Sequence, residues 1–216
     1  MNYWIPIIIL LMLCLVGYIR LSYLKKDNDK NKTFISLFLS NLREFCNELI
    51  EGKCNEEKFE WLQLNSEKVQ IQLGDYGRIK YKPSYSNIEY DNYLIIINGI
   101  YNIREWFYKL KYDFDGILKA EKRIIENPLL IYIGVINNYN EEIIKSLKNP
   151  VIWFREGIRA IVILPIYLVF WFGIIRYSTY KNANNNNITR FISFILTIIY
   201  LISSVITITG YNPFIK

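Results

Sequence analysis

The feature that most constrains this chain is an uncharged run near its start, Tyr3 to Ile19, with the sequence YWIPIIILLMLCLVGYI. A helix rises about 1.5 Å per residue, so this run just reaches across the hydrocarbon core of a thin bilayer. No basic residue precedes the run, while Arg20, Lys25 and Lys26 follow it, the reverse of a cleaved signal peptide. The sequence therefore predicts a retained transmembrane helix over residues 3–19.

Two more apolar blocks lie near the C-terminus. Residues 160–175 read AIVILPIYLVFWFGII, and residues 191–208 form a second run punctuated by hydroxyl side chains. Pro165 removes a backbone donor, so we expect a kink in the first of these helices. Residues 176–190 are polar and rich in asparagine, as in an exposed loop. The pattern predicts a C-terminal hairpin of two further transmembrane helices.

The charges indicate how such a protein would lie in the membrane. The chain has 26 Lys and Arg against 20 Asp and Glu, a formal charge of +6, and basic residues cluster where the middle segment meets the apolar blocks. Because basic residues favour the cytoplasmic side, we expect a multi-pass cell-membrane protein with a cytoplasmic middle domain. Within that segment basic and acidic residues are interleaved, which favours the lipid bilayer over nucleic acid as the partner.

The middle segment, residues 25–150, has the patterning of a mostly helical soluble domain. Apolar residues recur at helical spacing over 33–52, 114–127 and 128–148, and the run 93–103 with its polar continuation also favours a helix. Alternation around Gly74 and Gly77 within 68–81 suggests a short β-hairpin. The predicted fold class is a mainly α membrane protein, three transmembrane helices flanking a helical domain with a minor β-hairpin.

One segment stands out as a candidate site, NPVIWFREGIR at residues 149–159. Pro150 suits the first turn of a helix, and residues 151–159 mix aromatic and charged side chains as interfacial segments do. We expect Trp153, Arg155, Glu156 and Arg159 to contact lipid headgroups or a partner. Topological anchoring alone would also account for these residues.

This segment carries a family resemblance. It resembles part of a family of small uncharacterised bacterial integral membrane proteins. The resemblance also includes the following LP, FWFGII and LISSVITI in the last two apolar blocks, and LQLNSEKVQIQLGDYGRIKYKPSYSNI and LIYIGVINN in the middle segment. The resemblance extends from about Trp61 onward. It implies the membrane architecture and no particular activity.

Several chemistries are disfavoured by the residues themselves. The chain has no histidine, which removes the usual imidazole bases and metal ligands. No nucleotide-binding or nucleophile motif occurs, and Asp113 and Asp115 lack the further ligands of a calcium loop. The cysteines Cys14, Cys46 and Cys54 fit neither a zinc site nor a disulfide framework, and Cys46 could pair with Cys54 only outside the cytoplasm. We therefore expect no cofactor, metal or catalytic residue.

Three classes of function stay open on this evidence. The first is a non-enzymatic membrane-anchored protein whose domain binds a partner or senses a ligand, as a monomer or as a homo-oligomer. The second is a pore-forming or membrane-perturbing effector, in which the last two spans would pack or line an assembly. The third is an enzyme that uses carboxylates or Cys46 on substrates close to lipid.

Overall fold

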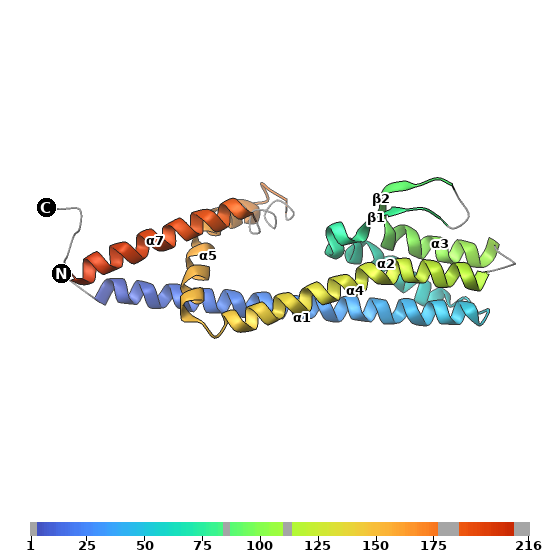
Figure 1. The fold of residues 1–216 in the computed structure, drawn as a ribbon, viewed down its shortest axis with the longest axis horizontal. Coiled ribbons are helices and arrows are strands. Elements are labelled where there is room, and N and C mark those ends of the chain that lie inside the picture. Colours follow the sequence, from blue (N-terminus) through green and yellow to red (C-terminus); the bar gives the residue numbers. More distant parts are fainter. Residues whose placement is uncertain (1–3, 84–86, 110–113, 177–185, 210–216) are drawn as a thin grey trace. The chain divides into compact units, whose positions relative to one another are not determined.

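The structure, a computed structural model, describes residues 4–83, 87–109, 114–176 and 186–209, and it is mainly helical with one two-stranded sheet (Figure 1). The chain forms two units, which are described separately below. The terminal unit comprises Met1–Lys26 and Asn140–Lys216, and the middle unit comprises Asp27–Tyr139.

Helix α1 runs without a break from Trp4 to Ile50 and supplies residues to both units. It contains the expected apolar helix over 3–19, from Trp4 onward, and the expected helix over 33–52 as far as Ile50, which the sequence had indicated as separate elements. The polar stretch between them contains neither glycine nor proline, so nothing interrupts the backbone hydrogen bonds. Gly52 follows the end of α1 with a φ of +78°, and the amide of Lys53 donates to the carbonyl of Glu48, an arrangement that commonly ends a helix.

The expected hairpin over 68–81 is wrong in its first half, and only its second half, at Arg78–Tyr81, is a strand. Residues Glu56–Leu73 form helix α2, capped by Asn55, whose side chain accepts a hydrogen bond from the amide of Lys58. The turn signal at Gly74 and Gly77 is a 3-10 helix, η1 (Gly74–Gly77), which ends α2. Helical spacing outweighed the short alternation in this segment. The buried side chains of α2 recur at that spacing, and they are Phe59, Leu62, Ser66, Val69, Gln70 and Leu73.

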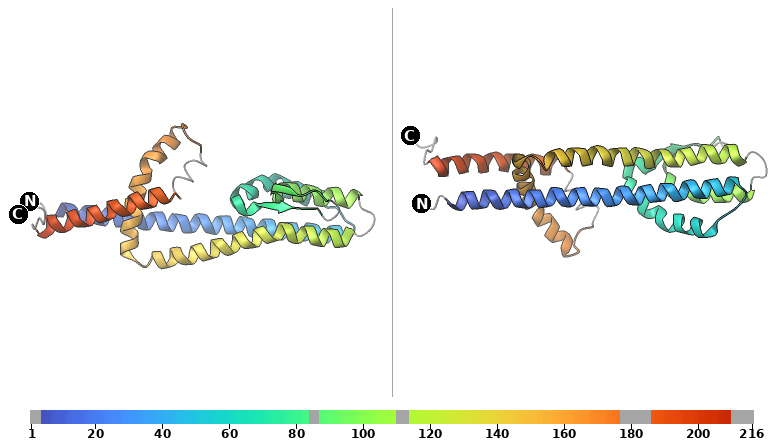
Figure 2. Two further views of the ribbon diagram at one scale, coloured as in Figure 1. Left: turned by 45° about the horizontal axis from the view of Figure 1, so that its top comes forward. Right: turned by 90° about the horizontal axis from the view of Figure 1, so that it is seen from below.

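The sheet pairs β1 (Arg78–Tyr81) with β2 (Tyr90–Leu94) in antiparallel register, Ile79 opposite Tyr93. Residues 93 and 94, which the sequence placed in a helix, therefore belong to a strand, and helix α3 spans Ile95–Lys109. Figure 2 shows the two strands beside α3 within the middle unit. A mainly helical fold with a small hairpin is thus confirmed, with the hairpin one element later than expected.

Helix α4 spans Phe114–Ser146 as one element, where the sequence had predicted two helices that meet at Pro128. Proline lacks a backbone donor, but α4 continues through it as a single helix. Arg43 of α1 pairs with Glu126 of α4 at 3.0 Å, and Lys122 donates to Asn47 at 3.1 Å. These contacts hold α1 and α4 together within the middle unit.

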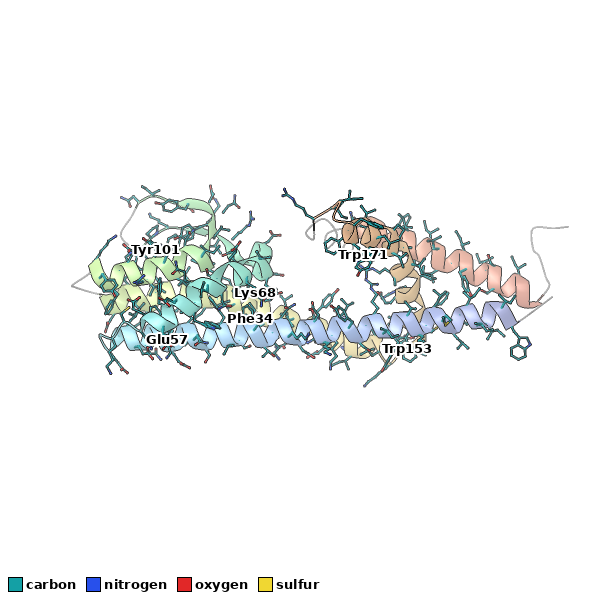
Figure 3. The ribbon with its side chains drawn as sticks, turned by 180° about the vertical axis from the view of Figure 1, so that it is seen from behind. Phe34, Glu57, Lys68, Tyr101, Trp153 and Trp171 are labelled. Atoms are coloured by element: carbon teal, nitrogen blue, oxygen red, sulfur yellow. The ribbon has the colours of Figure 1, made fainter. Side chains whose placement is uncertain are left out.

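The middle unit has a continuous apolar core. Its fully buried side chains come from α1, α2, α3 and α4, and they include Phe38, Leu42, Phe59, Leu62, Ile96, Ile103, Leu118 and Ile125. One buried amide ties the elements together, since Gln70 donates to the carbonyl of Gly77 and accepts from the amide of Ile96. At the surface, the ammonium of Lys68 lies 4.0 Å from the ring centre of Phe34 (Figure 3).

The terminal unit adds helices α5 (Pro150–Trp171) and α7 (Asn187–Thr209), which pack together. The expected segments 151–159 and 160–175 share α5, which ends four residues early at Trp171 with Phe172 as its cap. The end of the expected loop 176–190 is helical, because α7 begins at Asn187, and residues 177–185 of that loop lie outside the described residues. The expected helix 191–208 lies within α7.

One helix of the described chain is long and apolar enough to cross a membrane, the stretch of α1 that begins at Ile7. By its composition and position it could be a membrane span or a signal sequence.

Candidate functional site

The candidate site lies in the terminal unit, where α5 meets the first part of α1. Asn149 caps α5, and its side-chain oxygen accepts a hydrogen bond of 3.0 Å from the amide of Val151. Pro150 occupies the first turn as predicted, where its missing amide hydrogen costs nothing. The start of α5 is therefore fixed by local sequence, and this fixes the face on which Trp153, Glu156 and Gly157 lie.

Two glycines allow the backbones of the helices to approach closely. A Cβ added to Gly17 would lie 2.7 Å from the carbonyl carbon of Trp153 and 2.8 Å from the amide nitrogen of Gly157. A Cβ added to Gly157 would lie 2.8 Å from the carbonyl carbon of Leu13. Neither position has space for a larger residue, so this is a crossing of the small-residue type that is common between helices in membranes.

Aromatic side chains surround the glycine contact. The ring of Trp153, which is labelled in Figure 3, meets the ring of Tyr18 edge to face at 5.1 Å between centroids, a favourable geometry for aromatic pairs. Phe154 is buried against Leu13 and lies 5.2 Å from the ring of Tyr200 in α7. The crossing thus joins residues from the three helices α1, α5 and α7. Among the described residues, the buried indole Nε1 of Trp153 has no hydrogen-bond partner.

Glu156 is the centre of the ion pairs at this crossing, and it is buried with 4% of its surface exposed. Its Oε2 accepts a 2.6 Å hydrogen bond from Nη1 of Arg20 and lies 3.7 Å from Nη1 of Arg159. Its Oε1 accepts a 3.1 Å hydrogen bond from Nη2 of Arg155. Three guanidinium groups therefore converge on one carboxylate.

The burial of these groups decides what the cluster can do. A buried carboxylate without a partner is costly, so the ion pair of Glu156 and Arg20 holds the two helices in register. Arg155 differs, because 53% of its side chain is exposed and it can also bind a group outside the chain. The arrangement therefore contains a pairing of charges and one exposed guanidinium.

The structure brings together the four residues predicted from the sequence, Trp153, Arg155, Glu156 and Arg159, on successive turns of α5. It does not test their expected contact with lipid or a partner. The sequence analysis missed the other half of the site, Gly17 and Arg20 of α1. The one available signal was Arg20 as the first charge after the apolar run, which had been interpreted only as a topological anchor.

Other candidate residues lie elsewhere. Cys46 is completely buried in the core of the middle unit, and Cys46 and Cys54 are both free thiols. A nucleophile needs access to substrate, so the burial of Cys46 argues against a catalytic role. Asp113 lies outside the described residues, and within the described ranges no group of acidic or cysteine side chains could hold a metal ion.

Comparison with protein-family models, with curated proteins and with solved structures gives no match to this chain. The resemblance to small bacterial membrane proteins stays a prediction from the sequence segments that carry it.

Proposed function

We propose that this chain is a multi-pass membrane protein without enzymatic activity, whose middle unit binds a partner or senses a ligand. The observation that carries the proposal is the surface of the terminal unit. Only 17% of the most apolar stretch of α1 is buried, and α5 and α7 also expose large apolar side chains. They include Leu11, Met12, Ile19, Ile161, Leu164, Phe191, Phe194 and Ile199.

Such a surface is unfavourable in water. Soluble proteins rarely expose large continuous apolar areas, and burial of apolar surface is worth about 25 cal/mol per Å². The middle unit, by contrast, has one large cluster of buried apolar residues, although it also exposes some, such as Leu64 and Ile71. Lipid is therefore the solvent that best satisfies α1, α5 and α7, which supports three spans and a cell-membrane location.

The charged crossing supports the same proposal. Arg20 directly follows the apolar run of α1, and Arg155, Glu156 and Arg159 precede the apolar part of α5. Charged side chains at the ends of spans reach the headgroup region, where guanidinium groups bind phosphate. Exposed Arg155 is the residue best placed for a lipid phosphate, and Trp153 carries the indole typical of that region.

The middle unit supports partner binding because it has a complete core and a mixed charged surface. Its basic residues are the reason to propose that it faces the cytoplasm, following the usual bias of Lys and Arg. A second copy of the chain is one partner to be tested. Cys46, the cysteine considered above for an enzyme, is completely buried, which is why a non-enzymatic role is preferred.

The test starts with membrane fractionation. After alkaline carbonate extraction the intact chain is expected in the membrane pellet, and recovery in the supernatant would refute the proposal. A reporter fused after Lys32 gives the orientation, and activity of a cytoplasmic reporter is expected there. A protein or second copy that co-purifies through the middle unit supports partner binding.

The effector alternative gives a different result in the same cells. If induced expression causes dye entry or loss of membrane potential, the chain perturbs membranes, and the proposed role is wrong. A Gly157→Leu variant, which blocks the crossing of α1 and α5, is the matched control for toxicity that depends on the assembled helices.

A further inference from the structure

The middle unit contains a cavity that plays no part in membrane anchoring. Its volume is about 520 Å³, within the range of pockets that bind small molecules. Side chains from α2, from the β-hairpin and from α3 line it. Its walls are therefore formed by elements that follow one another along the chain, from α2 through the β-hairpin to α3.

Four tyrosines give the cavity its aromatic walls: Tyr81, Tyr90, Tyr93 and Tyr101. The inner pair is fixed, since the rings of Tyr81 and Tyr93 stack at 4.4 Å with 22° between their planes. The hydroxyl of Tyr81 donates to buried Glu121, and the hydroxyl of Tyr93 accepts from the side chain of Asn102. These rings keep their positions without a ligand.

The other two tyrosines form the rim. Tyr90 is 43% exposed and Tyr101, which is labelled in Figure 3, is 53% exposed, so both side chains leave apolar surface in contact with solvent. Holding large aromatic surface in water costs free energy that a ligand with an apolar face would recover.

Carboxamides supply the hydrogen-bonding groups, from Gln63 on α2 and from Asn98 and Asn102 on α3. Among the described residues, the side chains of Gln63 and Asn98 have no hydrogen-bond partner, whereas Asn102 is held by Tyr93. A carboxamide both donates and accepts, so it can match a hydroxyl group in either role.

The described residues that line the cavity are uncharged. No Asp, Glu, Lys or Arg occurs among the described residues that line it. A charged ligand would lose its hydration there and gain no ion pair in return, which disfavours nucleotides, phosphates and acidic peptides. The lining instead selects a neutral molecule with flat apolar faces and several hydroxyl or amide groups at its edges.

We propose that this cavity binds a neutral carbohydrate, with sugar rings stacked on Tyr90 and Tyr101 and hydroxyl groups bound by Gln63 and Asn98. Pyranose rings combine C–H faces with a perimeter of hydroxyl groups, which matches the alternation of phenol rings and carboxamides. The proposal goes beyond membrane anchoring and does not depend on it, because every residue involved belongs to the middle unit.

The probes are three neutral tetrasaccharides, maltotetraose, cellotetraose and tetra-N-acetylchitotetraose, with adenosine as a planar non-sugar comparison. The full chain in detergent is titrated by calorimetry to about 10 mM ligand, with saturation-transfer NMR on the sugar protons. At least one tetrasaccharide is expected to bind with a dissociation constant of about 1 mM or tighter.

Variants connect that binding to the cavity. Tyr101→Ala and Tyr90→Ala are each expected to weaken it by about tenfold or more, and Asn98→Asp is expected to weaken it by placing a charge in the lining. Tyr139→Ala is the matched control, since Tyr139 is 46% exposed and lies outside the lining. Far-UV circular dichroism establishes that each variant is folded.

Three results would overturn the proposal. The first is that none of the tetrasaccharides binds the folded chain. The second is binding that Tyr101→Ala and Tyr90→Ala leave unchanged, which would place the sugar elsewhere. The third is adenosine binding that is tighter than that of every sugar, which would assign the cavity to planar heterocycles.

Discussion

Gly17 of α1 and Gly157 of α5 face each other so closely that neither has room for a side chain. This contact brings Arg20 to 2.6 Å from Glu156, three residues further along α1 and one residue earlier on α5. A close helix crossing and a buried ion pair therefore depend on the same two glycines, and each can be tested separately.

Gly17→Ala and Gly157→Ala are expected to destabilise the terminal unit. Each added methyl group would overlap the other backbone, and overpacking of this kind costs about 1–3 kcal/mol. Gly134→Ala is the matched control, because nothing lies within 4 Å of that position and the change should add about 0.5–1 kcal/mol of helix stability. Thermal unfolding in detergent, followed by circular dichroism and tryptophan fluorescence, measures both. Equal stability of Gly17→Ala and Gly134→Ala would contradict the close crossing.

Glu156→Gln is expected to destabilise the same unit by about 2 kcal/mol or more, because Arg20 and Arg159 then lose the carboxylate that compensates their burial. Arg155→Gln is the control, and its effect should be below about 1 kcal/mol since half of that side chain is exposed. Chemical unfolding of Arg20→Gln, Glu156→Gln and the double variant gives the coupling between the two groups. If the losses of stability in Arg20→Gln and Glu156→Gln simply add in the double variant, the ion pair between these residues contributes nothing to stability.

Much of this architecture could be predicted from local sequence, and the crossing could not. The apolar run of α1 and the start of α5 at Pro150 are set by residues next to each other in the chain. The strand at 90–94 was missed because its neighbour β1 supplies the hydrogen bonds that a sequence pattern does not contain. Glu156 was identified, but its partner Arg20 lies 136 residues away and no spacing rule connects them.

Glu121 is expected to make the stability of the middle unit depend on pH. Burial raises the pKa of its carboxyl above the usual 4.5, against a smaller opposing effect of the hydrogen bond from Tyr81. The folded state therefore holds a proton that the unfolded state releases, and the free energy of unfolding falls as pH rises from about 4.5 through the folded pKa.

Glu121→Gln should remove that contribution and leave the middle unit more stable than the wild type at neutral pH. The amide oxygen can still accept from Tyr81, so the core contact is retained. Urea unfolding between pH 4 and pH 8 measures how the free energy of unfolding changes with pH in the wild type and in Glu121→Gln. A wild-type profile parallel to that of Glu121→Gln would show that Glu121 does not titrate differently in the two states.

The two cysteines of the middle unit are expected to react with maleimide at very different rates. Cys46 of α1 is completely buried in the core, whereas Cys54 follows the end of that helix and is partly exposed. Alkylation requires the reagent to reach the sulfur, so Cys46 should be modified only when the unit unfolds, at least about a hundredfold more slowly than Cys54. Mass spectrometry of tryptic peptides after timed labelling resolves the two sites, and labelling in urea should bring the rates together. Fast modification of Cys46 in the folded chain would mean that the core packing around Phe45 and Leu49 is wrong.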